Sequence, residues 1–205
     1  MIRKIAIFIL IIFYLDSSNA IAGKRKVLLI GIDGVRSDIL MNMHLYNFEF
    51  LSKNGFGTFQ SYHRDICISA PSWSSILCGV YHTKHGIVDN SFQGKNYKNY
   101  PMLPVMAKNI DPNLKFGMYM EWERFYNNSL SMEWDELRLG KMADTKKTVV
   151  ESKDWLKNSD LDFYFIYFGA VDYWGHRLGF SKWNPCYKNA LKDVDKGISE
   201  LLSAL

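Results

Sequence analysis

Four side chains in three separated segments of this chain have the chemistry of a phosphoester-cleaving site. Asp33 follows the apolar run VLLIGI, Ser69 stands in the segment ISAPSWSSILCG, and Asp172 and His176 stand in VDYWGH. Carboxylate oxygens and an imidazole nitrogen form a mixed ligand set that suits Zn²⁺. A serine hydroxyl beside such an ion can lose its proton and attack phosphorus. The three segments therefore predict part of a two-metal site.

Asp172 and His176 form the pattern D-x-x-G-H, in which we expect Gly175 to make a tight bend that turns both side chains toward one cation. Taken alone, an aspartate after a buried strand is as well explained as a cap for the next loop. A lone histidine is more readily explained as a hydrogen-bonded loop residue. The pairing of the two, directly after the apolar run DFYFIYF, favours metal ligation.

Ser69 immediately precedes an expected helix that begins at Pro71. Free backbone N–H groups and the positive end of the helix dipole favour an anion at such a position. An ordinary helix N-cap is the alternative role for a serine here.

Apolar periodicity predicts the elements that position these residues. The expected strands are 26–32, 116–120 and 162–168, and the expected helices are 37–53, 71–80, 143–156 and 193–205. Strands that alternate with helices predict an α/β fold with a mainly parallel central sheet flanked by helices. Ligands of such sheets bind beyond the carboxyl ends of the strands, where Asp33 and Asp172 are expected.

The N-terminus has the pattern of a signal peptide over residues 1–22. Arg3 and Lys4 precede an apolar run from Ile5 to Leu15, and the small residues Ala20 and Ala22 fit a cleavage site. The run is shorter than the roughly 20 residues of a membrane-spanning helix, so a retained anchor is the less favoured alternative. Residues 23–205 are therefore expected to be secreted or periplasmic, with no stable membrane anchor.

Composition indicates one compact domain. The chain has 205 residues, 48% of them hydrophobic, and a net charge of +4. The basic residues are scattered, so we expect no nucleic-acid binding. Cys67, Cys78 and Cys186 match no zinc or redox motif. One disulfide with a leftover thiol is an option in an oxidising compartment. The alternative for Cys67 and Cys78 is that both are small buried core residues.

Three segments carry a resemblance to a known family: GIDGVRSD (Gly31–Asp38), SAPSWSSILCGVYHTKHGIVDN (Ser69–Asn90) and VDYWGHRLGF (Val171–Phe180). The chain resembles the alkaline phosphatase superfamily and, within it, the type I phosphodiesterase and nucleotide pyrophosphatase branch. The resemblance implies an alkaline phosphatase-like fold over residues 23–205, incomplete at its C-terminal end.

The resemblance also assigns roles in a zinc-dependent hydrolase of small-molecule phosphoesters. Asp33 would bind one zinc together with Ser69, the nucleophile, and Asp172 with His176 would bind the second. Cleavage would pass through a covalent phosphoserine, which water then hydrolyses. Ser69 replaces the threonine of many relatives, and Ser72 stands where they have an asparagine that contacts a phosphoryl oxygen, so Ser72 is the expected phosphate contact.

Other metal ligands of the family have no counterpart after His176. Family members carry a later Asp-His pair and a further histidine, so three of the six metal ligands that the resemblance implies are expected here. The remaining histidines, His44, His63, His82 and His85, all lie upstream, and a structural role is expected for His85. The expectation is an impaired hydrolase that holds one zinc or none, or a non-catalytic remnant that binds metal weakly.

A sulfatase of the same superfamily is the weaker alternative. The segment Ser69-Ala70-Pro71-Ser72 resembles the start of the sulfatase signature. That signature requires arginine where this chain has Trp73, and sulfatases tend to have paired aspartates where this chain has Asp33 and Gly34.

Overall fold

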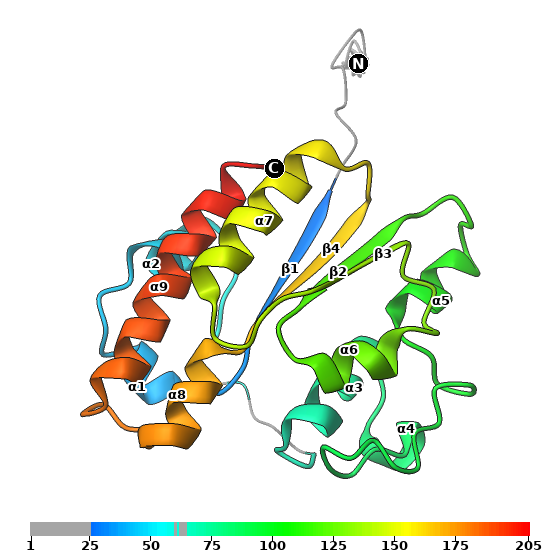
Figure 1. The fold of residues 1–205 in the computed structure, drawn as a ribbon, viewed down its shortest axis with the longest axis horizontal. Coiled ribbons are helices and arrows are strands. Elements are labelled where there is room, and N and C mark those ends of the chain that lie inside the picture. Colours follow the sequence, from blue (N-terminus) through cyan, green and yellow to red (C-terminus); the bar gives the residue numbers. More distant parts are fainter. Residues whose placement is uncertain (1–25, 60, 62–64) are drawn as a thin grey trace, which may run out of the picture.

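A parallel sheet of four strands forms the centre of the molecule (Figure 1). The computed structural model describes residues 26–59, 61 and 65–205, so the expected signal peptide and His63 lie outside the described residues. The strand order is β1 (Val27–Ile32), β4 (Phe163–Phe168), β2 (Phe116–Met120) and β3 (Glu136–Leu139). The predicted α/β fold with a mainly parallel sheet is confirmed.

Helices cover both faces of the sheet (Figure 1). The helices that pack on one face are α1 (Ser37–Leu40), α2 (Tyr46–Asn54), α7 (Thr145–Asn158), α8 (Ala170–Leu178) and α9 (Pro185–Leu202). The helices on the opposite side are α3 (Ser69–Cys78), α4 (His82–His85), α5 (Leu103–Lys108) and α6 (Glu123–Ser129).

Strand β4 shows why the central strands are continuous apolar runs. Its side chains alternate between two hydrophobic clusters, with Tyr164, Ile166 and Phe168 on the α7 and α9 side and Phe165 and Tyr167 on the α3 side. All five are 0–2% exposed. A strand buried on both faces has no polar positions to alternate with the apolar ones.

The strand register brings the carboxyl ends of three strands to one edge. Ile32 pairs with Phe168, and Met120 pairs with Tyr167. The residues that follow these ends, Asp33, Glu121 and Gly169, therefore lie at the same edge of the sheet. This edge is the position predicted for the site.

Two expected helices differ from the observed ones. The helix expected over 37–53 is divided into α1 and α2, with residues 41–45 between them. The last helix begins at Pro185 rather than at Asp193, because Asn184 Oδ1 accepts the N–H groups of Cys186 at 3.0 Å and Tyr187 at 3.1 Å. Strand β3 and helices α4, α5, α6 and α8 were not predicted.

The three cysteines are free thiols, so the structure contains no disulfide between them. Cys78 is buried, and burial raises the pKa of its thiol to about 12, which agrees with the core alternative. Cys67 is exposed, so the core alternative is wrong for this residue. Within the ranges that the structure describes, no helix has the length and apolar character needed to cross a membrane.

Candidate functional site at the carboxyl edge of the sheet

Asp33 is held by three hydrogen-bond donors. Its Oδ1 accepts the N–H of Gly34 at 2.9 Å. Its Oδ2 accepts the indole N–H of Trp73 at 3.1 Å and the hydroxyl of Tyr167 at 2.7 Å. A carboxylate offers about four lone-pair sites, and both sites of Oδ2 are occupied. A cation at Asp33 would therefore bind through Oδ1.

Gly34 brings the loop after β1 against the helix after β4. It has φ +72°, and a Cβ atom at this position would lie 2.5 Å from the Cα of Asp172. Only glycine permits both the backbone conformation and this approach. The structure thus brings the predicted ligand Asp33, in the loop after β1, close to the predicted ligand Asp172, in the first turn of α8. Burial, followed by the negative charge of Asp33, raises the pKa of Asp172 to about 6, against an opposing effect of His176.

Asp172 and His176 lie one turn apart on α8, with 3.4 Å between Asp172 Oδ1 and His176 Nε2. The expected tight bend at Gly175 is wrong, because α8 continues through this residue. Glycine is required there because a Cβ atom would lie 2.2 Å from the ring of Phe180. That ring packs edge-on against the imidazole of His176, with 5.1 Å between ring centroids.

Ser69 is the half-buried first residue of α3, one helical turn before Trp73. The N-cap alternative is wrong, since Ile68 is the N-cap and no side chain caps this end. Fewer free N–H groups face this end than predicted. Pro71 has none, and the N–H of Ser72 donates to the carbonyl of Ile68 at 3.0 Å.

Asn90 is a site residue that sequence reasoning missed. Its Oδ1 accepts the N–H of Ala70 at 2.9 Å, which places the amide at the beginning of α3 beside Ser69. The Nδ2 group remains as a donor. The available signal was its position at the end of the second matching segment. Ser72 is less well placed, because its hydroxyl donates to the carbonyl of Ile66 at 3.2 Å.

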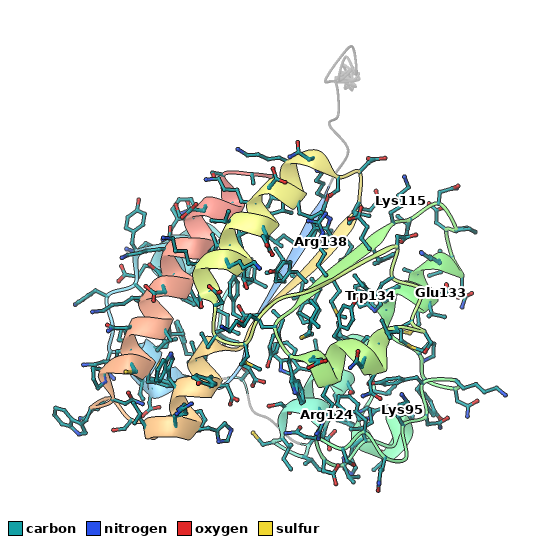
Figure 2. All side chains as sticks on the ribbon, in the orientation of Figure 1. Lys95, Lys115, Arg124, Glu133, Trp134 and Arg138 are labelled. Carbon is teal, nitrogen blue, oxygen red and sulfur yellow. The ribbon has the colours of Figure 1, made fainter. Side chains whose placement is uncertain are left out.

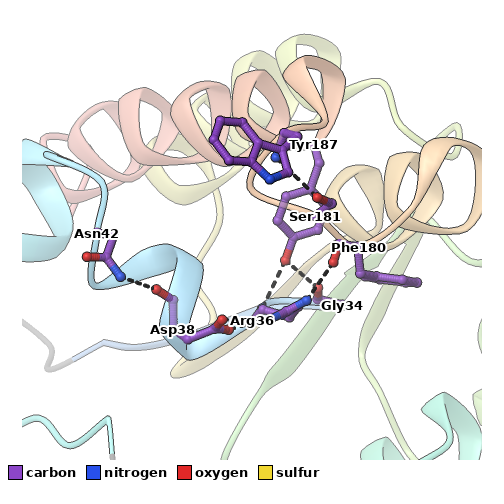
Figure 3. Close-up of polar contacts among 8 residues, drawn as sticks. Gly34, Arg36, Asp38, Asn42, Phe180, Ser181 and Tyr187 are labelled. Atoms are coloured by element: carbon purple, nitrogen blue, oxygen red, sulfur yellow. Dashed lines mark hydrogen bonds and ion pairs between the residues drawn. The ribbon is translucent and has the colours of Figure 1, made fainter.

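Tyr187 and Arg36 join the first and third matching segments (Figure 3). The Tyr187 hydroxyl donates to the carbonyl of Gly34 at 2.8 Å and accepts the N–H of Arg36 at 2.9 Å. The Arg36 guanidinium donates through Nη1 to the carbonyl of Phe180 at 2.7 Å. Segments far apart in the sequence are thereby fixed at one edge of the sheet.

Glu121 is a buried carboxylate, 2% exposed, that directly follows β2. Its Oε1 accepts the hydroxyl of Thr148 at 2.6 Å, and its Oε2 accepts the N–H of Gly169 at 2.8 Å and of Ala143 at 3.3 Å. Burial raises its pKa. Glu121 therefore ties the end of β2 to the beginning of α7 and to the residue before α8.

The upstream histidines have other environments. His44 is fully exposed, and His82 contacts the carboxylate of Asp65. His85 is 0% exposed, and its Nδ1 accepts the N–H of Ile87 at 3.2 Å. Its Nε2 must then carry the proton and donate to the Ser75 hydroxyl at 2.9 Å. This geometry confirms the structural role expected for His85.

The donor types at this edge fit zinc, but their number falls short of a closed site. Asp172 and His176 offer one oxygen and one nitrogen, and Asp33 offers Oδ1. A tetrahedral zinc takes four ligands. Across residues 26–59, 61 and 65–205, no cluster of three or more His, Cys, Asp or Glu side chains could hold a metal ion.

Comparison with known proteins agrees with these motifs. Residues 27–205 match the family type I phosphodiesterase / nucleotide pyrophosphatase. Bis(5'-adenosyl)-triphosphatase ENPP4 of Bos taurus is 26% identical over 92% of this chain and 45% of its own length. The enzyme of the same name from Xenopus laevis is 25% identical over 88% of this chain and 43% of its own. The chain thus spans slightly less than half the length of these relatives.

Solved structures show the same fold. Murine ectonucleotide pyrophosphatase / phosphodiesterase 5 superimposes with a TM-score of 0.68 at 21% identity, over 87% of this chain and 52% of that protein. The human protein of the same name gives a TM-score of 0.65 at 20% identity over the same shares. Because the family match covers nearly all of the described chain, this protein belongs to the type I phosphodiesterase / nucleotide pyrophosphatase family.

Proposed function

We propose that this protein is a hydrolase of small-molecule phosphoesters that acts through Ser69. One observation carries the proposal: hydrogen bonds join all three matching segments at the carboxyl edge of the sheet. The Trp73 indole connects the Ser69 helix to Asp33, and Arg36 connects the Asp33 loop to Phe180. An arrangement that assembles a nucleophile and carboxylates at this edge suits ligand binding and chemistry.

The proposed reaction has two steps. Ser69 Oγ forms a bond to phosphorus, the ester P–O bond breaks, and the alcohol leaves with a proton. Water then cleaves the Oγ–P bond and releases phosphate or a phosphomonoester. Zinc, when bound, lowers the pKa of the attacking hydroxyl and neutralises negative charge on the phosphoryl group.

The chain's own residues would orient the phosphoryl group. Asn90 Nδ2 would donate to a phosphoryl oxygen, because its Oδ1 is already occupied by the N–H of Ala70. We prefer Asn90 to Ser72 for this contact, although Ser72 remains a candidate. Asp33 would hold one cation with Ser69, and Asp172 with His176 would hold the second.

The relatives support nucleotides as the first substrates to test. The curated relatives are named for hydrolysis of a bis-adenosyl triphosphate. An inactive threonine-to-alanine variant of murine ectonucleotide pyrophosphatase / phosphodiesterase 5 has been solved in complex with AMP. A nucleotide phosphodiester is therefore the natural probe for this chain.

A non-catalytic, weakly metal-binding protein is the second candidate. It is favoured by the small number of ligands, since the described residues bring no three metal-binding side chains together. The two candidates differ in whether Ser69 reacts.

We also propose that residues 1–22 direct export and that residues 23–205 form one metallohydrolase domain. The apolar run in residues 1–22 supports export, and the single sheet with its two hydrophobic clusters supports one domain.

Zinc content and hydrolysis of a chromogenic phosphodiester test the function together. Two zinc ions per chain, with turnover that is lost in Ser69→Ala, would support the hydrolase. One zinc or none, with no turnover in either protein, would leave the non-catalytic candidate. Turnover that is equal in the two proteins would refute the role of Ser69.

A further inference from the structure

The indole of Trp73 is fixed in place on three sides. Its ring lies 5.7 Å from that of Phe165 and 5.3 Å from that of Tyr167, measured between centroids. Gly31 of β1 leaves room for it, because a Cβ atom there would lie 2.7 Å from the indole ring. The N–H of this half-buried ring donates to Asp33 Oδ2.

Trp73 also lies four residues after Ser69 on α3. Side chains four residues apart occupy the same face of a helix. The face of α3 that contacts Asp33 is therefore the face that carries Ser69. Tyr167, from β4, donates to the same carboxylate oxygen and closes the group.

We propose that Trp73 is a positioning residue that sets the separation and orientation of Ser69 and Asp33. With Tyr167, it occupies Oδ2 and leaves Oδ1 as the atom of Asp33 that faces a cation. The proposal rests on the function proposed for Ser69. It assigns a specific task to the residue that stands where sulfatases have arginine.

The consequence for chemistry is geometric. A nucleophile that is displaced by about 1 Å can lose on the order of 100-fold in rate. Loss of the indole N–H frees α3 to shift relative to Asp33, while the groups that bind the distal part of a substrate stay in place. The defect should therefore appear in kcat and not in KM.

Trp73→Phe is the test variant, because it keeps an aromatic ring and deletes the N–H donor. The phenyl ring is also smaller than the indole, and Trp134→Phe is the matched control because it makes the same loss of ring volume. Trp134 is 8% exposed, and its Nε1 is a buried donor without an acceptor in the part of the chain that the structure describes. Figure 2 shows Trp134 near β3, which is the edge strand opposite β1. Turnover of a chromogenic phosphodiester is measured for all three proteins, with melting temperatures to establish folding.

We expect kcat to fall about 10- to 100-fold in Trp73→Phe with KM within about twofold, and Trp134→Phe to resemble the wild type. A second measurement does not depend on turnover. In ¹⁵N-labelled protein, the indole N–H resonance of Trp73 is assigned by its loss in Trp73→Phe. Its hydrogen exchange should be slow in the wild type and at least tenfold faster in Asp33→Ala.

Equal kcat in Trp73→Phe and Trp134→Phe would overturn the proposal. An indole exchange rate that is the same in wild type and Asp33→Ala would also overturn it. If the wild type shows no Ser69-dependent turnover, the proposed function fails by itself, and the exchange rates alone then decide whether Trp73 holds Asp33.

Discussion

The two halves of the candidate site are built differently. Asp33 receives three hydrogen bonds and lies against a helix that is tied to it through Trp73. The imidazole of His176 is 73% exposed, and its contacts are the Asp172 carboxylate and the edge of Phe180. The comparison teaches that hydrogen bonds within the protein fix the Asp33 half, whereas the His176 half is exposed and has few contacts that fix its side chain.

One glycine determines how the halves meet. The backbone of Gly34 touches that of Asp172, and Tyr187 holds the Gly34 carbonyl from α9. Changes at this junction should disturb both halves, and changes within the exposed half should disturb chemistry alone.

Gly34→Ala should have the largest effect on stability. The new Cβ atom would combine a positive φ with a 2.5 Å approach to Asp172, so we expect a loss of about 3 kcal/mol or more. Gly79→Ala is the matched control, because Gly79 has φ +66° and no atom within 4 Å. It should cost about 1 kcal/mol. Urea unfolding measures both, and equal losses would contradict contact between the halves.

Glu121→Gln should come next, at about 1–3 kcal/mol. The amide of the variant keeps one acceptor oxygen. Its NH₂ group faces a donor that bonds to the carboxylate in the wild type, either the N–H of Gly169 or the hydroxyl of Thr148. Since Gly169 precedes α8, the Asp172 half should also move. Thermal unfolding tests the loss of stability, and an unchanged melting temperature would show that Glu121 does not connect these elements.

The change in folding stability with pH that Glu121 causes should be smaller than the loss in Glu121→Gln, and its sign is defined. Burial raises its pKa above the ordinary value of 4.5, so between these two values the folded state binds more protons than the unfolded state. Its stabilising contribution is therefore full below about 4.5 and declines as pH rises through the raised pKa. The stability difference between wild type and Glu121→Gln should shrink from pH 5 to pH 8. A difference that grows would contradict this assignment.

His176→Ala should have the smallest effect on folding and a large effect on chemistry. Because the imidazole is 73% exposed, we expect a stability change within about 0.5 kcal/mol. If His176 binds a cation, turnover should fall by on the order of 100-fold, because the loss of a residue that only supports a metal ligand already costs about 10- to 100-fold. His44→Ala, at a fully exposed histidine away from the site, is the control. Equal activity in both variants would remove His176 from the mechanism.

The sequence predicted the parts of the fold that depend on burial. Strands β1, β2 and β4 were located to within a residue, because each is a continuous apolar run. Strand β3 was missed because its four residues, ELRL, alternate charged with apolar side chains and form no such run. Helix α8 was missed because Gly175 suggested a turn, whereas it makes room for Phe180.

The sequence predicted where the candidate site residues lie and missed the groups that support them. Asp33, in the loop after β1, and Asp172, in α8, do lie close together at the predicted edge of the sheet. Two of the groups that hold them, Trp73 and Tyr167, sit in apolar segments, and nothing in their local pattern distinguishes them from core residues. Glu121 follows a predicted strand, as Asp33 does, so its position was an available signal. Their role follows from hydrogen bonds between residues 40 to 134 positions apart, which no local pattern contains.

The proposed mechanism requires a covalent bond between Ser69 and phosphorus. The most direct test is acid quenching during turnover of a nucleotide phosphodiester, followed by mass spectrometry of the peptide that contains Ser69. In the wild type, Ser69 should carry the phosphoryl group together with the ester group that is not displaced, and no residue of Ser69→Ala should carry this adduct. Turnover without an adduct on Ser69, or with the adduct on a different residue, would contradict the mechanism.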